Sequence, residues 1–234
     1  MTILLPIRAG SQRVVRKNVR KFSDFKFGLA ELKIRQLICL DQVDEILIDT
    51  DLEEMDEILE LLNSENLDLS RIRVEKRDEK FAGSDATTDD LISYLAPKVR
   101  TTDVLWTHTT QPFLGPAKIK EAINLYFDVQ EKGFDSLMSV TSLKTFIWNE
   151  KGAVNYSREI EKWPRTQTLP NWVAINSGIF ITSDQIMKSK MDRIGERPYL
   201  FELDKVEGWD IDEEDDFKIA ESIANSLMKD SLFI

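Results

Sequence analysis

The chain has 234 residues, of which 31 are Lys or Arg and 42 are Asp or Glu, so its formal net charge is −11. Hydrophobic residues make up 42%, which is typical of globular proteins and excludes an intrinsically disordered chain. The length is enough for one substantial domain with a sizeable core. The acidic balance argues against nucleic-acid binding, which depends on positive charge.

A cytoplasmic location is expected from the cysteine content. The single cysteine, Cys39, cannot form an internal disulfide, as is usual in a reducing compartment. No apolar run approaches the roughly 18 residues of a membrane-spanning helix, so no membrane contact is expected. The opening sequence MTILLPIRAG is too short, and too uncharged at its front, for a secretory signal.

The first half of the chain alternates between two hydrophobic patterns. Short apolar runs and helical spacing predict, in order, a strand at 2–7, a helix at 28–40, a strand at 44–51, a helix at 53–62, a strand at 71–76, a helix at 87–96, a strand at 103–108 and a helix from Pro116. Such alternation indicates an α/β fold, in which a parallel sheet carries helices on both faces.

The alternation breaks in the second half. Strands are predicted at 134–140, 172–182 and 199–203, and a closing helix at 213–229. Residues 141–171 are irregular and indicate a β-arm or small subdomain. Their aromatic residues suit an interface, with packing in the core or beside a substrate as the alternative. The expected architecture is one α/β sandwich with a single excursion.

The charge is unevenly distributed between the two ends. Residues 1–23 contain six basic residues and no acid, whereas EGWDIDEEDD at 207–216 holds seven acids and no base. A basic segment indicates an anion site, and a dense acidic segment indicates a cation site. Each run also has a plainer interpretation: a solvated loop for the basic one, and a helix N-terminus for the acidic one.

The first predicted strand runs into the basic loop LPIRAGSQRVVRKN at 5–18. Open α/β sheets bind ligands at the carboxyl edge, where this loop would lie. Gly10 lets a phosphate approach the backbone closely. Groups suited to a triphosphate follow at Arg8, Ser11, Arg13 and Lys17. The patterns GxxxxGK[ST] and GxGxxG are absent from the loop, which disfavours a P-loop NTPase and a standard NAD-binding domain.

WDID at 209–212 is the second motif. If this segment is a strand, Asp210 and Asp212 point to one face with Cα atoms roughly 6.6 Å apart. Two such carboxylates can hold Mg²⁺ beside phosphate oxygens. The alternative is that the aspartates cap the helix expected to begin near Glu213. The spacing alone leaves both possibilities open.

Together these motifs resemble those of the CMP-sialic acid synthetase (acylneuraminate cytidylyltransferase) family. LPIRAGSQRVVRKN is similar to the family's IPARxGSxxxxxKN, and DIDEEDDFKIAE at 210–221 is similar to DIDTEEDFxxAE. Looser matches lie between them in the family's order, at DTDLEEM (49–55), EKRDEKFAGSDATTDDLI (75–92), WTHTTQPFL (106–114) and RTQTLPNWVAINSGIFI (165–181).

The resemblance implies transfer of CMP from CTP to the anomeric hydroxyl of a 2-keto-3-deoxy sugar acid, of the acidic nine-carbon type or a relative, with release of pyrophosphate and a requirement for Mg²⁺. It also implies a Rossmann-like three-layer sandwich with a mixed, mostly parallel sheet, of the nucleotide-diphospho-sugar transferase type. The chain would be one domain, residues 1–234, that forms a homodimer through the arm at 141–171.

The resemblance also implies roles for individual residues on the nucleotide side. The triphosphate, and the charge that develops on pyrophosphate, would be held by Arg8, Ser11, Arg13 and Lys17. Further nucleotide contacts would come from Asn18, Arg77, the backbone of Ala82 and the hydroxyl of Thr87. The catalytic set would be Arg8, Lys17 and the metal ligands Asp210 and Asp212.

On the sugar side, Arg165 is the expected partner of the carboxylate, since the guanidinium fork matches that geometry. Gln167 and Asn176 would bind sugar hydroxyls. His108, the only histidine, stands where the family has a glutamine near the acceptor. It is expected to bind a sugar hydroxyl or carboxylate or to take the anomeric proton, although a lone histidine on a strand is often a hydrogen-bonded core residue. No general base is assigned.

Departures from the family pattern gather on the sugar side. Family residues are replaced at Thr109, Thr110, Gln111 and Leu114, and Ser177 is inserted. This favours an unusual acceptor, such as legionaminic or pseudaminic acid, over the commonest sialic acid. On the nucleotide side, Asp78 replaces a proline and could orient Arg77 or weaken its reach to cytosine.

Three alternative functions fit the sequence less well. Kdo (2-keto-3-deoxy-manno-octonic acid) cytidylyltransferases usually carry LQGDEP at the fourth strand, where this chain has WTHTTQP and no acid. A non-catalytic CTP-binding relative would tolerate loss of Lys17 or Asp210, and both are present. A structural protein with a borrowed fold leaves the ordered motifs unexplained.

Overall fold

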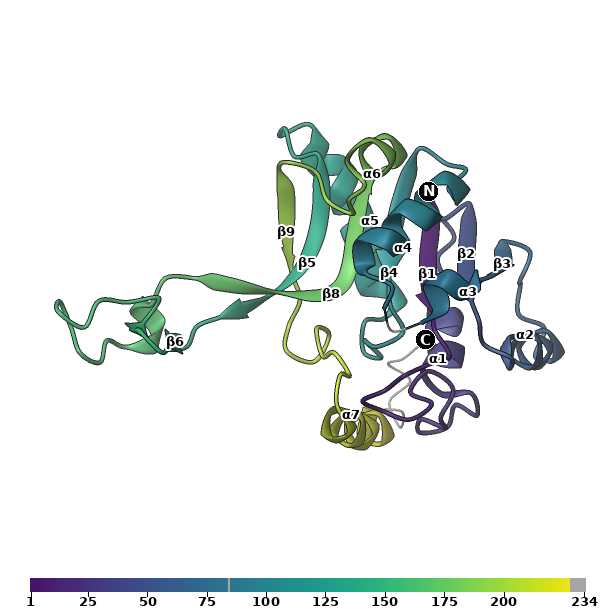
Figure 1. Ribbon diagram of the computed structural model, residues 1–234, viewed down its shortest axis with the longest axis horizontal. Coiled ribbons are helices and arrows are strands. Elements are labelled where there is room, and N and C mark those ends of the chain that lie inside the picture. The colour runs from purple at the N-terminus through teal and green to yellow at the C-terminus, as the bar shows by residue number, and fades with distance from the viewer. Residues whose placement is uncertain (84, 228–234) are drawn as a thin grey trace.

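A seven-stranded mixed sheet forms the centre of the protein in the computed structural model, which describes residues 1–83 and 85–227. Its strand order is β3-β2-β1-β4-β8-β5-β9 (Figure 1). The parallel half comprises β1 (Thr2–Ile7), β2 (Glu45–Thr50), β3 (Ile72–Lys76) and β4 (Asp103–Thr107). The antiparallel strand is β8 (Trp172–Ser183), which separates β4 from β5 (Ser136–Leu143). The outermost strand, β9 (Pro198–Glu202), is parallel to β5.

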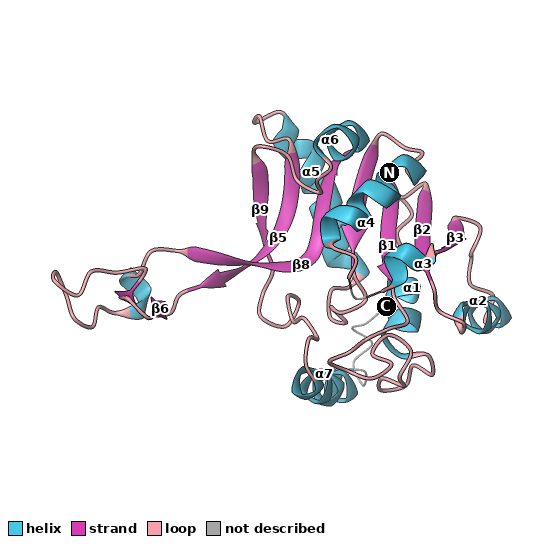
Figure 2. Ribbon diagram, viewed as in Figure 1, coloured by secondary structure: helices cyan, strands magenta, loops and turns pink. Residues whose placement is uncertain are grey.

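Helices cover both faces of this sheet (Figure 2). One face packs against α1 (Gly28–Ile38), α2 (Met55–Ser64) and α5 (Pro116–Gln130). The other packs against α4 (Thr88–Leu95), the short helix η1 (Ala96–Lys98) and α6 (Asp184–Lys190). In β1, Ile3 and Leu5 belong to the first core and Leu4 to the second, since successive side chains of a strand point to opposite faces. The predicted three-layer sandwich with a mixed sheet is confirmed.

A third core joins the two ends of the chain. Phe217 of α7 (Glu214–Leu227) packs edge-on against Phe22, with ring centroids 5.4 Å apart. Arg20 lies over the Phe217 ring at 3.7 Å and donates to both carboxylate oxygens of Glu214 at 2.9 and 3.0 Å. The acidic segment therefore lies against the basic loop. The predicted helix reaches 229, and its last two positions lie outside the described residues.

An arm projects from the body where β5 and β8 run on beyond the sheet (Figure 1). Its base pairs Val140 through Leu143 with Ile175 through Trp172. Its tip carries β6 (Trp148–Asn149), β7 (Gly152–Ala153) and the short helix η2 (Thr166–Thr168). The tip contains an aromatic cluster, because the ring of Phe146 packs edge-on against those of Tyr156 and Trp163.

The main strands and helices match the sequence predictions to within a few residues. The short helices α3 (Glu79–Ala82) and α6 were not predicted, because four and seven residues give too little periodicity to recognise. None of the helices in the described part of the chain is long and apolar enough to span a membrane.

Candidate active site

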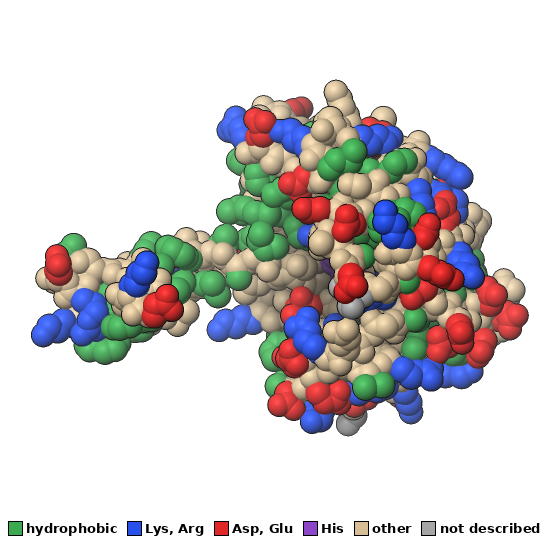
Figure 3. Space-filling model, in the orientation of Figure 1, with side chains coloured by type: hydrophobic (Ala, Val, Ile, Leu, Met, Phe, Trp, Pro, Cys, Tyr) green, Lys and Arg blue, Asp and Glu red, His purple; other side chains and the backbone are tan. Residues whose placement is uncertain are grey.

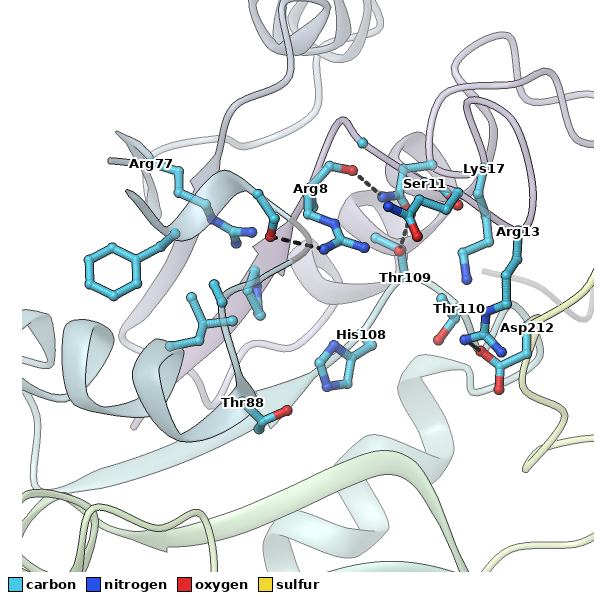
Figure 4. A pocket seen from close by; sticks show the side chains of 18 of the residues that line it. Arg8, Ser11, Arg13, Lys17, Arg77, Thr88, His108, Thr109, Thr110 and Asp212 are labelled. Carbon is cyan, nitrogen blue, oxygen red and sulfur yellow. Dashed lines mark hydrogen bonds and ion pairs between the residues drawn. The ribbon is translucent and has the colours of Figure 1, made fainter. Parts of the chain in front are cut away.

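A cavity of about 570 Å³ opens at the carboxyl ends of β1 and β4. Its walls come from the loop after β1, the segment between β3 and α4, the first turn of α4, the residues after β4, and the WDID segment. Figure 4 shows cationic side chains from the first two segments facing the space that His108 and Asp212 also reach. The fold therefore collects both charged motifs at the expected edge of the sheet.

Most of the predicted nucleotide-side residues line this cavity: Arg8, Ser11, Arg13, Lys17, Asn18, Arg77 and Thr87, together with Asp210 and Asp212. Ala82 does not line it, although the neighbouring residues Phe81 and Gly83 do. The structure thus brings the four residues of the predicted catalytic set to one cavity. Their roles stay predictions at this point.

Three hydrogen bonds fix the shape of the basic loop. The backbone N–H of Ala9 donates to Asp51 Oδ1 at 2.7 Å. Asn18 Nδ2 donates to the carbonyl oxygen of Arg8 at 2.7 Å, and Asn18 Oδ1 accepts from the hydroxyl of Thr109, also at 2.7 Å. Asn18 therefore joins the start and the end of the loop and anchors both to the residues after β4.

The WDID segment has no regular secondary structure, so the strand interpretation is wrong. The chain has left the sheet after β9, and Ile211 makes one backbone bond, from its N–H to the carbonyl of Thr110 at 2.9 Å. Asp216 lies in the first turn of α7, and its Oδ2 accepts from the N–H groups of Asp212 and Glu213, which precede the helix, at 3.1 and 2.8 Å. Within the described residues, no backbone N–H of α7 donates to Asp210 or Asp212, so capping by either is also wrong; both carboxylates line the cavity.

Lys17 joins the basic and acidic motifs directly. Its Nζ donates to the carbonyl oxygen of Ile211 at 2.7 Å, from 194 positions away in the sequence. Burial lowers the pKa of Lys17, while Asp212 and Asp210 act in the opposite direction. Because this ammonium lies beside both carboxylates, its pKa depends on any charged ligand that binds between the two motifs.

Arg13 also bridges the motifs, but at the surface. Its Nη2 lies 2.6 Å from Asp212 Oδ1, and its Nη1 lies 3.3 Å from Glu213 Oε1. Asp212 is the main cause of the raised pKa of Arg13. These side chains are about half exposed, so the pairs hold them weakly and can open for a ligand.

The acidic pair fits a divalent cation that also binds phosphate. Asp210 Oδ1 is buried and has no hydrogen-bond partner among the described residues. Burial raises the pKa of Asp210, and Asp212 adds to this effect. A cation bound nearby would stabilise the ionised carboxylate. Within the described residues, no group of three or more His, Cys, Asp or Glu side chains could hold a metal. A bound ion would therefore depend on substrate oxygens, as Mg²⁺ often does.

Arg77 enters the cavity wall from a buried ion pair. Its Nε lies 2.6 Å from Asp49 Oδ2, and its Nη2 donates to the carbonyl of Asp49 at 2.9 Å. Asp78 does not orient it, because Asp78 Oδ1 accepts from the N–H of Lys80 and caps α3. Nearby, the hydroxyl of Thr87 is engaged in the capping box of α4.

The predicted sugar-side residues are dispersed. His108 lines the cavity. Arg165 and Gln167 lie exposed on the arm, outside the cavity lining. Asn176 is buried, with Oδ1 accepting from Ser139 Oγ at 2.5 Å and Nδ2 donating to Thr141 Oγ1 at 3.0 Å. Next to it, the inserted Ser177 has a φ of 60° and forms a bulge in the β5–β8 pairing.

Several lining residues were not predicted from the sequence. Thr110 offsets part of the rise that burial causes in the pKa of Asp210. Thr88 begins α4, and Phe81 stacks on Tyr94 with centroids 4.3 Å apart. Asp49 lies outside the cavity lining but holds Arg77, and it gave one signal: it is an acid inside the apolar strand EILIDT. The other three gave none, because threonine and phenylalanine are ordinary in loops and helix ends.

The sheet with its basic loop and edge cavity defines a nucleotide-binding α/β enzyme fold. A family model described as cytidylyltransferase matches residues 2–171. The chain therefore belongs to the cytidylyltransferase family, whose members are nucleotidyltransferases that use CTP. No curated protein sequence matches the chain significantly.

Solved structures share the fold at low identity. A CMP:2-keto-3-deoxy-manno-octonic acid synthetase, solved in complex with CTP, has a TM-score of 0.66 and 13% identity, over 96% of this chain and 98% of that one. The 4-diphosphocytidyl-2C-methyl-D-erythritol synthase of Anaerococcus prevotii has a TM-score of 0.67 and 13% identity, over 97% and 95%. The 2-C-methyl-D-erythritol 4-phosphate cytidylyltransferase of Thermus thermophilus has a TM-score of 0.56 and 11% identity, over 95% and 97%. These likenesses concern the fold alone.

Proposed function

We propose that this cytidylyltransferase transfers CMP from CTP to the anomeric hydroxyl of a sialic-acid-like 2-keto-3-deoxy sugar acid, of the N-acylneuraminic, legionaminic or pseudaminic type. Pyrophosphate is the second product, and Mg²⁺ is required. The observation that carries the proposal is one cavity in which Arg8 and Lys17 from the first motif face Asp210 and Asp212 from the last. The order of the sequence motifs supports the choice of acceptor.

The reaction exchanges one bond at phosphorus for another. The anomeric oxygen forms a bond to the α-phosphorus, the bond from that phosphorus to the α–β bridging oxygen breaks, and the hydroxyl proton is released. Arg8, Arg13 and Lys17 would bind the triphosphate and stabilise the charge that develops on pyrophosphate. Asp210 and Asp212 would hold Mg²⁺, which supplies charge neutralisation at phosphate oxygens when bound.

The acceptor type is favoured by the chemistry at the end of β4. The cavity residues that follow this strand are His108, Thr109 and Thr110, none of which is acidic. An acid at this place is the feature by which Kdo cytidylyltransferases differ in sequence, so its absence supports a sialic-acid-like acceptor over Kdo. Kdo remains the alternative, to be tested alongside.

A homodimer is proposed as the working form. Hydrophobic side chains follow the arm and continue onto the body beside it (Figure 3), and Ile160 at the tip is 89% exposed. Exposed apolar residues in one region favour burial against a second copy. Because Arg165 and Gln167 lie on the arm, outside the cavity of their own chain, they would contact a sugar in the partner's cavity.

The test measures pyrophosphate release with CTP, Mg²⁺ and, separately, N-acetylneuraminic, legionaminic, pseudaminic and Kdo acids. Release with one of the first three supports the proposal, and UTP in place of CTP is the control for the nucleotide. Release with Kdo alone would move the function to the alternative. No release with any acid, while CTP still binds, would contradict the proposed acceptor class.

A further inference from the structure

Two hydrogen-bond donors meet on one ring nitrogen of His108. The indole Nε1 of Trp106 donates to His108 Nε2 at 3.1 Å, and Nη1 of Arg193 lies 3.3 Å from the same atom. Indole and guanidinium groups can only donate hydrogen bonds. The nitrogen between them must therefore be an acceptor without a proton, which leaves the proton of a neutral imidazole on Nδ1.

Both donors are held by packing. The Trp106 side chain, on β4, is buried in the core between the sheet and α4. Arg193, between α6 and β9, lies over the Phe180 ring at 4.0 Å and over the Trp106 ring at 5.3 Å. Neither residue lines the cavity. They act on the site through His108, which makes them positioning residues.

The charges around His108 also favour the neutral ring. The cations that act on it come from four segments, as Arg193, Lys17, Arg77 and Lys33. Burial and these cations lower the pKa of His108 to about 3. Burial lowers the pKa of Arg193, and the acids on this side, Asp192 and Asp89, partly offset that effect.

The Nδ1 edge of the ring is available to a ligand. Among the described residues, no protein atom forms a hydrogen bond with Nδ1, and His108 lines the cavity together with Arg8 and Thr88. Figure 4 shows its ring in the space between these two side chains. A cavity lined by Arg8, Arg13 and Lys17 attracts anionic oxygens, which are the acceptors that an N–H group binds best.

We propose that His108 is fixed by Trp106 and Arg193 as the neutral Nδ1–H tautomer, and that it donates a hydrogen bond to an anionic oxygen of a bound substrate instead of acting as a general base. No ring lone pair remains open to take the anomeric proton. The oxygen belongs either to the CTP triphosphate or to the carboxylate of the acceptor, and the second case rests on the proposed function.

The tautomer can be measured without any acceptor, because the chain contains one histidine. A long-range ¹H–¹⁵N correlation spectrum of the ¹⁵N-labelled protein at pH 7 should show one imidazole, with Nδ1 protonated and Nε2 bare. A protonated Nε2, alone or together with Nδ1, would overturn the proposal whether or not the acceptor class is right.

Ligand additions to the same sample distinguish the two sources of the oxygen. A shift of the Nδ1 signal with CTP and Mg²⁺ alone assigns the donor to the triphosphate. A shift that needs the acceptor found in the pyrophosphate assay assigns it to the carboxylate. No shift with CTP, Mg²⁺ and that acceptor together would refute the donor role.

Substitutions separate a donor from a base. His108→Asn keeps an N–H close to the Nδ1 position, whereas His108→Leu removes it. We expect His108→Leu to raise KM for the ligand identified by NMR about 10- to 100-fold, and His108→Asn to stay within a few-fold of the wild type. Equal effects of the two variants, with both folded by circular dichroism, would contradict the donor role.

The pH profile gives an independent check. Between pH 6 and 8, kcat/KM of the wild type and His108→Asn should have the same shape, because the ring does not titrate there. A fall in kcat/KM toward low pH that is present in the wild type and absent from His108→Asn would identify a general base and overturn the proposal. Arg193→Met should raise the NMR-measured pKa of His108, which a merely structural arginine would not do, and Arg193→Lys should restore it.

Discussion

Arg77 and Asp49 form an ion pair that water scarcely reaches. Arg77 Nε lies 2.6 Å from Asp49 Oδ2, and the two side chains are 3% and 1% exposed. The other carboxylate oxygen of Asp49 accepts from Lys98 Nζ at 3.1 Å. One acid at the end of β2 thus pairs with two cations, of which Lys98 also pairs with Glu75, and it holds Arg77 at the cavity wall.

Removing this acid should be costly. Asp49→Ala leaves a buried guanidinium unpaired, which we expect to lower the free energy of unfolding by about 3–5 kcal/mol, measured by urea denaturation. The matched control is Asp41→Ala, which breaks the surface pair with Lys120 and should barely change stability. Similar losses in the two variants would contradict the structural role of Asp49.

The acidic pair should control the dependence on Mg²⁺. Asp210→Asn and Asp212→Asn are each expected to lower kcat by about 100-fold or more and to shift the Mg²⁺ titration of the initial rate to higher concentration. Asp215→Asn, in the same acidic segment but 86% exposed and paired with Lys218, should leave both unchanged. Wild-type rates in Asp210→Asn would refute the assignment of the site.

Lys33 should make stability depend on pH in the alkaline range. It is fully buried on α1, and its Nζ donates to the carbonyl oxygens of Gln111 and Leu114, both at 3.0 Å. Burial lowers the pKa of Lys33 to about 7, against about 10.4 in an unfolded chain. Between these values the unfolded state binds more protons, so stability rises with pH there.

The substitution Lys33→Met should abolish this rise. The wild-type free energy of unfolding is expected to gain up to about 1.4 kcal/mol per pH unit from this group above pH 7, followed by urea denaturation at several pH values. Lys120→Met removes a half-exposed lysine and should keep the wild-type slope. A slope that survives in Lys33→Met would have another origin.

The arm should determine the oligomeric state. Ile160→Glu places a charge on the most exposed apolar side chain of the arm, and we expect it to convert a dimer into a monomer in sedimentation velocity. Phe127→Glu is the control, because Phe127 is an exposed apolar residue on α5, away from the arm. A wild-type chain that sediments as a monomer would exclude the dimer.

The fold was largely predictable, because each main element shows its own periodicity. The apolar run TILLPI indicates a strand, and the spacing of apolar residues over 28–40 indicates a helix, each without reference to the rest of the chain. The cavity was predictable for a different reason: the carboxyl edge of the sheet collects the residues that follow its strands. That rule brought Arg8 and Lys17 to one place with His108 and Asp212.

The parts of the site that were not predicted depend on long-range contacts, which no local sequence pattern encodes. The WDID pattern fitted a strand or a helix cap, and the structure shows neither. Instead, Asp216 accepts from the backbone N–H of Asp212, and Lys17 donates to the carbonyl of Ile211. Asp78 was a reasonable partner for Arg77 by proximity in sequence, but the partner is Asp49, 28 residues away. Long-range pairs of this kind depend on the register of the sheet, which is a property of the whole fold.

A competition assay tests the central claim most directly. CTP, Mg²⁺ and equal amounts of N-acetylneuraminic, legionaminic, pseudaminic and Kdo acids are incubated with the protein, and the CMP-linked product is identified by its mass. We predict a CMP conjugate of one of the three nine-carbon acids, formed together with pyrophosphate. A CMP conjugate of Kdo, or hydrolysis of CTP without a conjugate, would contradict the proposed function.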